Sequence, residues 1–329
     1  MPKLNINDKS KFKVLVFRNV DIGNTVVSEP FFRILKKMYP NVIIHGVFDE
    51  IGTQLMDANP FIDEVFTFNK NRDSFKSKVK LVKKWKKEKY LFSFHLKSGI
   101  TNELMAFASG IPHRIGFPLK GSIQFVNTKV IKRKELLHHF ENGRYLLSIF
   151  GREIPTFLPQ LYSSETSNKR LRKLLIDQNL EKKNYVVLHP TGKTMKKGNW
   201  SIDYYSDVID EIIVKFNIPV VIIGIPNELE EIKSLIGERE NLQYYFEDNI
   251  ILKSELIKNS KYFIGNDSGP FHIAESWQVP SVVLYKKKDD GYKRWYPLNK
   301  EKSLPIFIHE LSKKEKVLNK VFDFLDRWN

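Results

Sequence analysis

The sequence of 329 residues contains no cysteine. This excludes a disulfide framework and any metal site built from thiolates, and it is consistent with a reducing cytoplasm. No apolar run reaches the roughly 18 residues that a membrane-spanning helix needs. The first residues lead from a polar stretch directly into a strand-like run, without the hydrophobic region and cleavage site of a signal peptide. We therefore expect a cytoplasmic protein.

Two kinds of motif are also missing. No G-x-G-x-x-G follows the first predicted strand, which argues against a dinucleotide-dependent oxidoreductase. The sequence lacks zinc-finger spacing, an RNP-like aromatic motif and a basic region followed by heptads, so we expect no nucleic-acid partner. Positive charge, by contrast, is in excess: 54 Lys and Arg against 38 Asp and Glu give a net charge of +16. Such a balance either attracts a polyanion, such as anionic lipid or a phosphorylated substrate, or only keeps the protein in solution.

Short β-rich runs alternate with longer helical patterns, which predicts parallel sheets covered by helices on both faces. The predicted strands lie at residues 12–17, 42–48, 90–96, 185–189, 219–224, 261–265 and 280–285. The predicted helices lie at residues 26–38, 72–90, 101–109, 136–150, 203–215, 227–236, 251–259, 270–277 and 312–328.

The alternation pauses at residues 151–168, a segment rich in Pro, Ser and Thr that we interpret as a linker. The sequence therefore predicts an α/β protein with two doubly wound domains, at residues 1–160 and 161–310, and a last helix within residues 311–329. In such sheets, ligands bind outside the carboxyl ends of the strands.

The segment FIGNDSGPFHIAESWQVPSVVLY (residues 263–285) is apolar at both ends and is interrupted by Asp-Ser-Gly-Pro (267–270), with His272 close behind. Three interpretations are open. A Ser-His-Asp hydrolase triad is disfavoured, because the adjacent Asp267 and Ser268 leave no room for the histidine between them. A structural role, in which Asp or Ser caps a helix, explains the Ser-Gly-Pro sequence well and the histidine poorly.

The third interpretation is an anion site. A strand, a turn of small residues and a helix N-terminus present free N–H groups and the positive end of a helix dipole, which suit a phosphate. Ser268 can donate its hydroxyl, Gly269 permits close approach of the backbone, and His272 can donate from the first turn. Asp267 would repel a phosphate at close range, so we expect it to bind a hydroxyl or to hold the loop. Helix capping and anion binding are compatible.

The segment NDSGPFHIAESWQVPSVVLY resembles the D-[ST]-G-x-x-H-x-x-[AS] signature of glycosyltransferase family 9, the bacterial lipopolysaccharide heptosyltransferases. Other segments resemble that family in the same order, and together they cover most of the chain. They are VLVFRNVDIGNTVVSEPFFRILKKMYP (14–40), ANPFIDEVFTFNK (58–70), HLKSGITNELMAFASGIPHRIGF (95–117) and VVLHPTGKTMKKGNWSIDYYSDVI (186–209).

The resemblance implies the GT-B architecture, in which two Rossmann-like domains face each other across a cleft. It implies an acceptor-binding N-terminal domain, a nucleotide-sugar-binding C-terminal domain and a final helix that crosses back to the first domain. The implied activity is that of an inverting glycosyltransferase that works without a cofactor or a metal. It would move heptose from ADP-heptose onto a lipopolysaccharide core or a related anionic glycan at the cytoplasmic face of the inner membrane. A family member with another donor or acceptor is the alternative.

On the donor side, the resemblance assigns these residues to the diphosphate, the sugar and the phosphate loop: Asp267, Ser268, Gly269, His272, Thr191 and Gly192. The lysine that precedes the family tryptophan matches Lys197, although Lys193 or Lys196 could replace it because the spacing is one residue longer here. A lysine and a helix N-terminus stabilise the charge of a leaving diphosphate. The sequence has no D-x-D motif, which would have indicated a metal-dependent transferase.

The acceptor side departs from the family pattern. The family loop ends in Gly-Asp, and that aspartate is regarded as the base that deprotonates the acceptor hydroxyl, whereas the matching residue here is Asn24. A neutral amide cannot take a proton. Asp21 or Glu29 could serve as the base instead. Alternatively, Asn24 only orients the acceptor, or the protein is a weakly active or non-catalytic nucleotide- or glycan-binding homologue.

Other acceptor contacts are expected from Arg18, Lys97 and Ser98, which follow predicted strands. The alternatives are an ion pair between Arg18 and Asp21 and a solvated loop at residues 97–98. The segment RDSFKSKVKLVKKWKKEKY (72–90) has nine basic and two acidic residues. Its apolar residues recur at helical spacing, so it predicts either a peripheral contact with an anionic membrane or an ordinary solvated helix.

Overall fold

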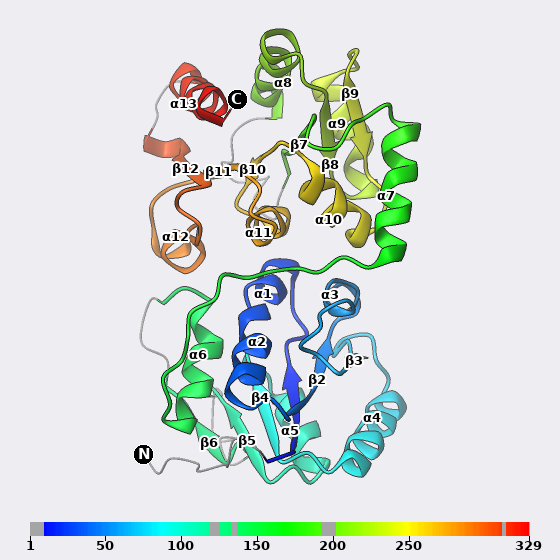
Figure 1. The fold of residues 1–329 in the computed structure, drawn as a ribbon, viewed down its shortest axis with the longest axis vertical. Helices are drawn as coiled ribbons and strands as arrows, with labels where there is room; N and C mark the ends of the chain where they lie inside the picture. Colours follow the sequence, from blue (N-terminus) through cyan, green and yellow to red (C-terminus); the bar gives the residue numbers. More distant parts are fainter. Residues whose placement is uncertain (1–9, 119–125, 133–136, 192–201, 311–313, 329) are drawn as a thin grey trace. The chain divides into compact units, whose positions relative to one another are not determined.

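The computed structural model describes residues 10–118, 126–132, 137–191, 202–310 and 314–328. The chain divides into two compact units, Met1–Tyr162 and Ser163–Asn329. Each unit is built around a six-stranded parallel sheet with helices on both faces (Figure 1). The alternation of short apolar runs and helical patterns therefore predicted the α/β class correctly.

The sheet of the first unit has the order β3-β2-β1-β4-β5-β6. Its elements are β1 (Lys13–Phe17), α1 (Ile22–Val26), α2 (Glu29–Met38), β2 (Ile43–Phe48), α3 (Glu50–Met56), β3 (Glu64–Thr67), α4 (Phe75–Glu88), β4 (Phe92–His95), α5 (Ile100–Ala108), β5 (His113–Gly116), β6 (Lys129–Val130) and α6 (Glu141–Leu147). Strand β1 is buried along almost its whole length because helices cover both of its faces. On one face, Trp85 of α4 and Met105 of α5 pack against Phe17 and its neighbours.

The sheet of the second unit has the order β12-β11-β10-β7-β8-β9. Its elements are α7 (Glu165–Asp177), β7 (Val186–His189), α8 (Ile202–Phe216), β8 (Val220–Ile223), α9 (Leu229–Ile236), β9 (Leu242–Tyr245), α10 (Ile250–Asn259), β10 (Tyr262–Asn266), α11 (Gly269–Ser276), β11 (Ser281–Tyr285), α12 (Asp290–Trp295), β12 (Ser303–Phe307) and α13 (Lys314–Trp328). Read from β9 to β12, this is the same topology as in the first sheet.

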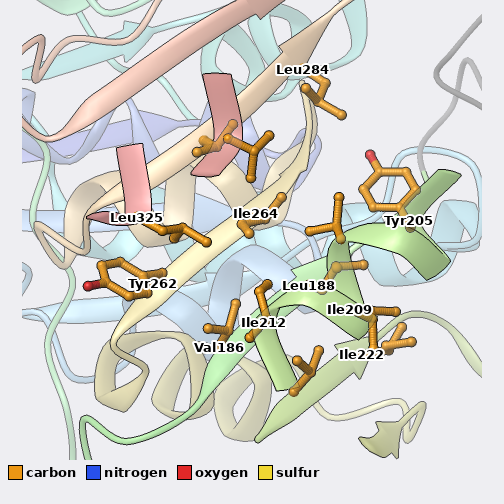
Figure 2. Packing of buried hydrophobic residues seen from close by; sticks show 14 of the residues in the cluster. Val186, Leu188, Tyr205, Ile209, Ile212, Ile222, Tyr262, Ile264, Leu284 and Leu325 are labelled. Atoms are coloured by element: carbon orange, nitrogen blue, oxygen red, sulfur yellow. The ribbon is translucent and has the colours of Figure 1, made fainter. Parts of the chain in front are cut away.

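The core of the second unit joins strands to helices from both ends of its sequence. Figure 2 shows Val186 and Ile264 of the central strands beside Ile209 and Ile212 of α8. Leu325 of α13 is 1% exposed and belongs to the same cluster. Burying such a side chain stabilises the fold by about 1.5–3 kcal/mol. Helix α13 thus packs on the second unit, and its expected contact with the first unit stays a prediction.

Two predicted segments end differently in the structure. The helix predicted at residues 26–38 is replaced by α1 and α2, because Asp21 caps a first short helix and Pro30 occupies the first turn of a second one. Helix α7 begins inside the predicted linker, where Ser164 and Ser167 form a reciprocal capping box. Among the described residues, no helix is both long enough and apolar enough to cross a bilayer.

Candidate functional site

Each sheet has one point where the chain reverses the direction in which strands are added. It lies between β1 and β4 in the first unit and between β7 and β10 in the second. The loops that follow these strands leave towards opposite faces of the sheet, which opens a crevice at the carboxyl edge where ligands bind. The residues predicted for the acceptor and donor sites fall at these two points.

In the first unit, the guanidinium of Arg18 joins the ends of β1 and β4. Arg18 follows β1 directly and is 2% exposed. It donates to the carbonyl of Leu96 at 2.8 Å, to Oδ1 of Asn24 at 2.8 Å and to the carbonyl of Asn24 at 2.9 Å. These neutral acceptors satisfy a charge that would otherwise be costly to bury. Arg18 therefore holds the loop that carries Asn24 against the end of β4.

Asp21 and Asn24 lie on the first turn of α1. Oδ1 of Asp21 accepts from the backbone N–H of Asn24 at 3.2 Å and from its side-chain Nδ2 at 2.7 Å. The hydrogen bonds fix the orientation of the amide, with its oxygen towards Arg18 and its nitrogen towards Asp21. Asn24 is buried and Asp21 is exposed. The carboxylate is thus held at the surface of this edge.

The loop after β4 contributes Lys97, which is exposed, and Ser98, which is half-buried. It continues into α5, where both carboxylate oxygens of Glu103 accept from the N–H of Gly99 at 3.1 Å. Burial raises the pKa of Glu103 to about 7. The structure therefore places a buried, protonatable carboxyl group behind this loop. Sequence analysis had not selected it, because a glutamate in a first helical turn is ordinary.

Glu29, one of the two alternative bases, has a different role. It is fully buried, pairs with Arg33 at 2.9 Å and accepts from the N–H of Gln160 and the hydroxyl of Tyr162. Burial raises its pKa to about 7, against the opposing charge of Arg33. The side chain thus fastens the chain segment that ends the first unit. Arg114 is also structural: it is buried and donates to the carbonyls of Ile111 and Val126.

In the second unit, Asp267, Ser268 and Gly269 form the turn between β10 and α11 (residues 262–276). Ser268 occupies the N-cap position of α11, but its side chain makes no capping hydrogen bond. Helix capping by Ser268, one of the structural roles considered above, is therefore not what the hydroxyl does. The first turn of α11 keeps its dipole, but Pro270 has no N–H and that of Phe271 donates to the carbonyl of Ser268 at 3.1 Å, which leaves the N–H of Gly269 for another acceptor.

The Ser268 hydroxyl instead belongs to a network around His189, at the end of β7. Ser268 Oγ lies 3.2 Å from Nδ1 of His189, and Thr191 Oγ1 lies 3.2 Å from Nε2. Thr191 Oγ1 also donates to the carboxylate of Glu228 at 3.1 Å, and Ser268 Oγ donates to the carbonyl of Asn266 at 3.1 Å. Burial, with a smaller contribution from Lys253, lowers the pKa of His189 to about 3. The imidazole is neutral and links the two predicted phosphate-binding hydroxyls.

His272 lies behind Asp267 and is 3% exposed. Its Nε2 is 4.0 Å from Oδ1 of Asp267, its Nδ1 is 3.8 Å from Oε2 of Glu275, and its ring packs against Trp295 at a centroid distance of 4.9 Å. Burial raises the pKa of Asp267 to about 6; the neighbouring His272 lowers it and Asp289 raises it further. His272 thus lies beside Asp267 and away from solvent. Trp295, which sequence analysis did not select, covers the imidazole.

Lys253 is the other residue that sequence analysis missed. It lies near the start of α10 and is 7% exposed, and its side chain forms no hydrogen bond or ion pair with any described residue. Burial lowers its pKa, while the more distant carboxylates of Asp248, Glu228 and Glu247 raise it. Helix α10 follows β9, so Lys253 lies near the carboxyl edge of the second sheet, and its charge lowers the pKa of His189. An unpaired buried cation is costly unless a ligand neutralises it.

Two predicted donor residues, Gly192 and Lys197, lie outside the described residues, as do the alternatives Lys193 and Lys196. The other predicted site residues follow the strands that flank the two switch points: Arg18, Asp21, Asn24, Lys97 and Ser98 in the first unit, and Thr191, Asp267, Ser268, Gly269 and His272 in the second. Within the described parts of both units, no group of three or more His, Asp or Glu side chains could hold a metal ion.

Comparison with known proteins gives a consistent picture. Residues 78–322 match the family model described as glycosyltransferase family 9 (heptosyltransferase). A putative glycosyltransferase of Haemophilus influenzae is 23% identical over 300 residues, which cover 87% of this chain and 86% of that protein. Lipopolysaccharide heptosyltransferase 2 of Escherichia coli is 22% identical over 290 residues, which cover 83% of this chain and 82% of the enzyme.

Solved structures show the same fold. A family 9 glycosyl transferase from Veillonella parvula superposes with a TM-score of 0.84 at 18% identity, covering 99% of this chain and 100% of that one. The ADP-heptose lipopolysaccharide heptosyltransferase II of E. coli gives a TM-score of 0.79 at 20% identity, with 96% and 99% covered. At such identities the likeness concerns the fold alone, and it confirms the predicted GT-B architecture.

Proposed function

Because this chain belongs to glycosyltransferase family 9, the heptosyltransferase family, and is a glycosyltransferase, we propose that it moves heptose from ADP-heptose onto a lipopolysaccharide core or a related anionic glycan. We place this reaction at the cytoplasmic face of the inner membrane, where such a lipid-linked acceptor is assembled. The first unit would bind the acceptor and the second unit the nucleotide sugar.

The reaction we propose is a single displacement with inversion. The acceptor hydroxyl oxygen attacks the anomeric carbon, the bond from that carbon to the diphosphate breaks, and ADP leaves with the bonding electrons. The proton of the hydroxyl passes to Asp21, the exposed carboxylate held by the Asn24 amide. Arg18 fixes that amide and so positions Asp21 indirectly. A positioned base of this kind typically contributes about 10²–10⁴-fold to the rate.

On the donor side, we propose that the first turn of α11 and the hydroxyls of Ser268 and Thr191 bind the diphosphate. Lys253 would add the positive charge that the leaving ADP requires as the glycosidic bond breaks. Lys197 and Gly192 remain proposed phosphate ligands on the basis of the family resemblance. Asp267, whose pKa is raised to about 6, would accept from a sugar hydroxyl, with His272 positioning it.

The observation that carries this proposal is the contrast between the two switch points. One holds an exposed carboxylate beside a buried Arg–Asn pair, and the other holds hydroxyls, an uncapped helix N-terminus and an unpaired lysine. A base and an anion site are the two elements that transfer from a nucleoside diphosphate donor needs.

A thermal-shift screen of nucleotide sugars tests the donor directly, because a ligand that binds only the folded state raises the unfolding temperature. ADP-heptose and ADP should raise it, whereas UDP- and GDP-sugars at the same concentration should not. A shift with another nucleotide only would replace the donor and keep the transferase. Product formation with purified acceptor then separates a transferase from the alternative that Asn24 suggests, a homologue that binds its ligands without reacting.

A further inference from the structure

Helix α4 (Phe75–Glu88) presents a row of four lysines on its outer face. Lys76, Lys80, Lys83 and Lys87 follow one another at spacings of four, three and four residues, which places them on one side of a helix. All four side chains are exposed. None of them forms an ion pair or hydrogen bond with any residue that the structure describes.

Of the other charges of this helix, all but that of Lys86 have a described partner. Lys78 donates to the carbonyl of Lys70 at 3.2 Å. Lys84 pairs with Glu64 at 2.8 Å, and Glu88, the one acidic residue of α4, pairs with Lys13 at 2.7 Å. The opposite face of the helix is apolar and packs on the first sheet through Trp85, which is fully buried. The lysine row, together with Lys86, therefore makes no described contact that would hold the fold.

The row is unfavourable for the isolated protein in two ways. Like charges three and four residues apart repel each other along a helix. The first turn of α4 contains Lys76 and Lys78 but no acidic residue, so positive charge lies at the positive end of the helix dipole. An anionic surface would relieve both effects at once.

Phe75 adds an apolar group at the N-terminal end of the row. Its side chain is 82% exposed, the second most exposed large hydrophobic residue among those described. A phenyl ring beside several cations is the composition that inserts at a lipid interface while lysines contact anionic head groups. A protein partner or a polynucleotide would account for the charges of the lysine row, but neither requires the ring of Phe75 to face solvent in the free protein.

The position of the helix connects this surface to the acceptor site. Helix α4 follows β3, so its first turn lies at the carboxyl edge of the first sheet, the edge that also carries Asp21 and Lys97. From there α4 runs along the outside of the first unit (Figure 1). A membrane bound along this row would lie beside the edge to which a lipid-linked acceptor must come.

We propose that Phe75 and the lysine row of α4 dock the first unit on an anionic bilayer, an inference that rests on the proposed function only for the identity of the acceptor. Four lysines near an anionic surface are worth a change of roughly 100-fold or more in partition coefficient. The attraction is screened by salt over about 8–10 Å.

Sedimentation with phosphatidylglycerol-containing and pure phosphatidylcholine vesicles tests the proposal. The wild-type protein should bind the anionic vesicles alone and be released by salt. The variant K76Q/K80Q/K83Q/K87Q should lose on the order of 100-fold in partition coefficient, and Phe75→Ser should lose less. A matched variant changes four exposed lysines of the second unit that have no described ion pair: K173Q/K182Q/K316Q/K320Q. It has the same net charge and should bind like the wild type.

Equal losses in the two quadruple variants would show attraction by net charge alone and would overturn the proposal, as would equal binding to neutral vesicles or none to either kind. A transfer assay keeps this result separate from the proposed reaction. With a detergent-dispersed acceptor the α4 variant should be as active as the wild type, and with a vesicle-embedded acceptor it should be slower. Unaltered vesicle binding by an enzyme that transfers no sugar would leave the docking surface standing and remove the proposed function.

Discussion

The side-chain amide of Asn24 donates a hydrogen bond of 2.7 Å to the carboxylate of Asp21. Its oxygen accepts from Arg18 at 2.8 Å, so the neutral amide separates the buried cation from the exposed carboxylate. A carboxylate bonded directly to an arginine is a weaker base, because the cation lowers its pKa. Asn24 therefore positions Asp21 without a direct contact between the carboxylate and the Arg18 cation.

If Asp21 is the base, Asp21→Asn should lower kcat by about 10²–10⁴-fold. The affinity for ADP should not change, because the donor binds the other unit. Steady-state kinetics and calorimetric titration measure the two quantities. Asp57→Asn, an exposed aspartate at the far end of α3, is the control and should behave like the wild type. A full rate in Asp21→Asn would assign the proton to another group.

The reverse exchange at position 24 tests the same arrangement. Asn24→Asp would place a second carboxylate oxygen about as close to Asp21 as the present amide nitrogen, and two carboxylates at that distance cannot both be ionised at ordinary pH. We expect no gain in rate at neutral pH and a rate–pH profile whose acidic limb moves to higher pH. A rise in rate at neutral pH would mean that the natural protein lacks its base.

The donor site is tested at Ser268. Ser268→Ala removes a hydroxyl donor to a charged phosphate, and such hydrogen bonds are worth about 1.5–3 kcal/mol, or roughly 10- to 150-fold in affinity. Titration with ADP should show that loss while the unfolding temperature stays close to that of the wild type. Ser276→Ala changes a serine at the other end of α11 and should leave ADP affinity unaltered. Equal affinities in all three proteins would place the diphosphate elsewhere.

At Lys253, we expect a substitution to change ADP affinity and protein stability in opposite directions. Lys253→Met keeps most of the side-chain volume and removes a buried charge, so the variant should unfold at the same or a higher temperature. Its affinity for ADP should fall about 10-fold or more, as expected for a hydrogen bond to a charged group. Lys258→Met, on the same helix, breaks contacts with Ser163 and Trp277 and should instead lower stability without affecting ADP. Undiminished ADP affinity in Lys253→Met would remove this residue from the donor site.

Glu29 should make stability depend on pH. Its pKa is about 7 in the folded protein and 4.5 in the unfolded chain, so between those values the folded state holds a proton that the unfolded state has lost. The free energy of unfolding should therefore fall as pH rises through this window, by at most about 3 kcal/mol. Glu29→Gln cannot lose a proton, so the stability of the wild type relative to this variant should decline from pH 5 to pH 8. A constant difference would show that Glu29 is already ionised at pH 5. Glu50→Gln, an exposed glutamate of α3, supplies the baseline.

The sequence predicted the central strands well, because runs such as residues 185–189 are continuously apolar and bounded by polar turns. It missed β3, β5, β6, β9 and β12, all of which except β5 are edge strands. Pro305 in β12 argues against a strand unless it lies at an edge. Helices α3, α7 and α12 were also missed; α3 and α12, with seven and six residues, are too short to show a period.

The candidate site was predictable where it follows a motif and not where it depends on packing. Asp21 and Asn24 were expected on one loop, but the orientation of the amide depends on Arg18, which is held in turn by the carbonyl of Leu96, 78 residues away. Lys253 belongs to no motif, and a lysine in a helical pattern is normally solvated. Only the packing of α10 on the sheet shows that it is buried.

The identical strand order of the two sheets means that the same topology carries two sites with opposite chemical requirements. The point between β1 and β4 is occupied by the protein's own cation, Arg18, whose hydrogen bonds are satisfied within the protein, and Asp21 lies beside it as a proton acceptor. At the equivalent point between β7 and β10, two hydroxyls contact a neutral imidazole whose pKa is lowered by the cation of Lys253, a combination that favours an anionic ligand. A few loop side chains on two sheets of the same topology would then decide which unit binds the nucleophile and which binds the leaving group. Exchanging donor specificity within this architecture should accordingly require changes in loops and leave the sheets untouched.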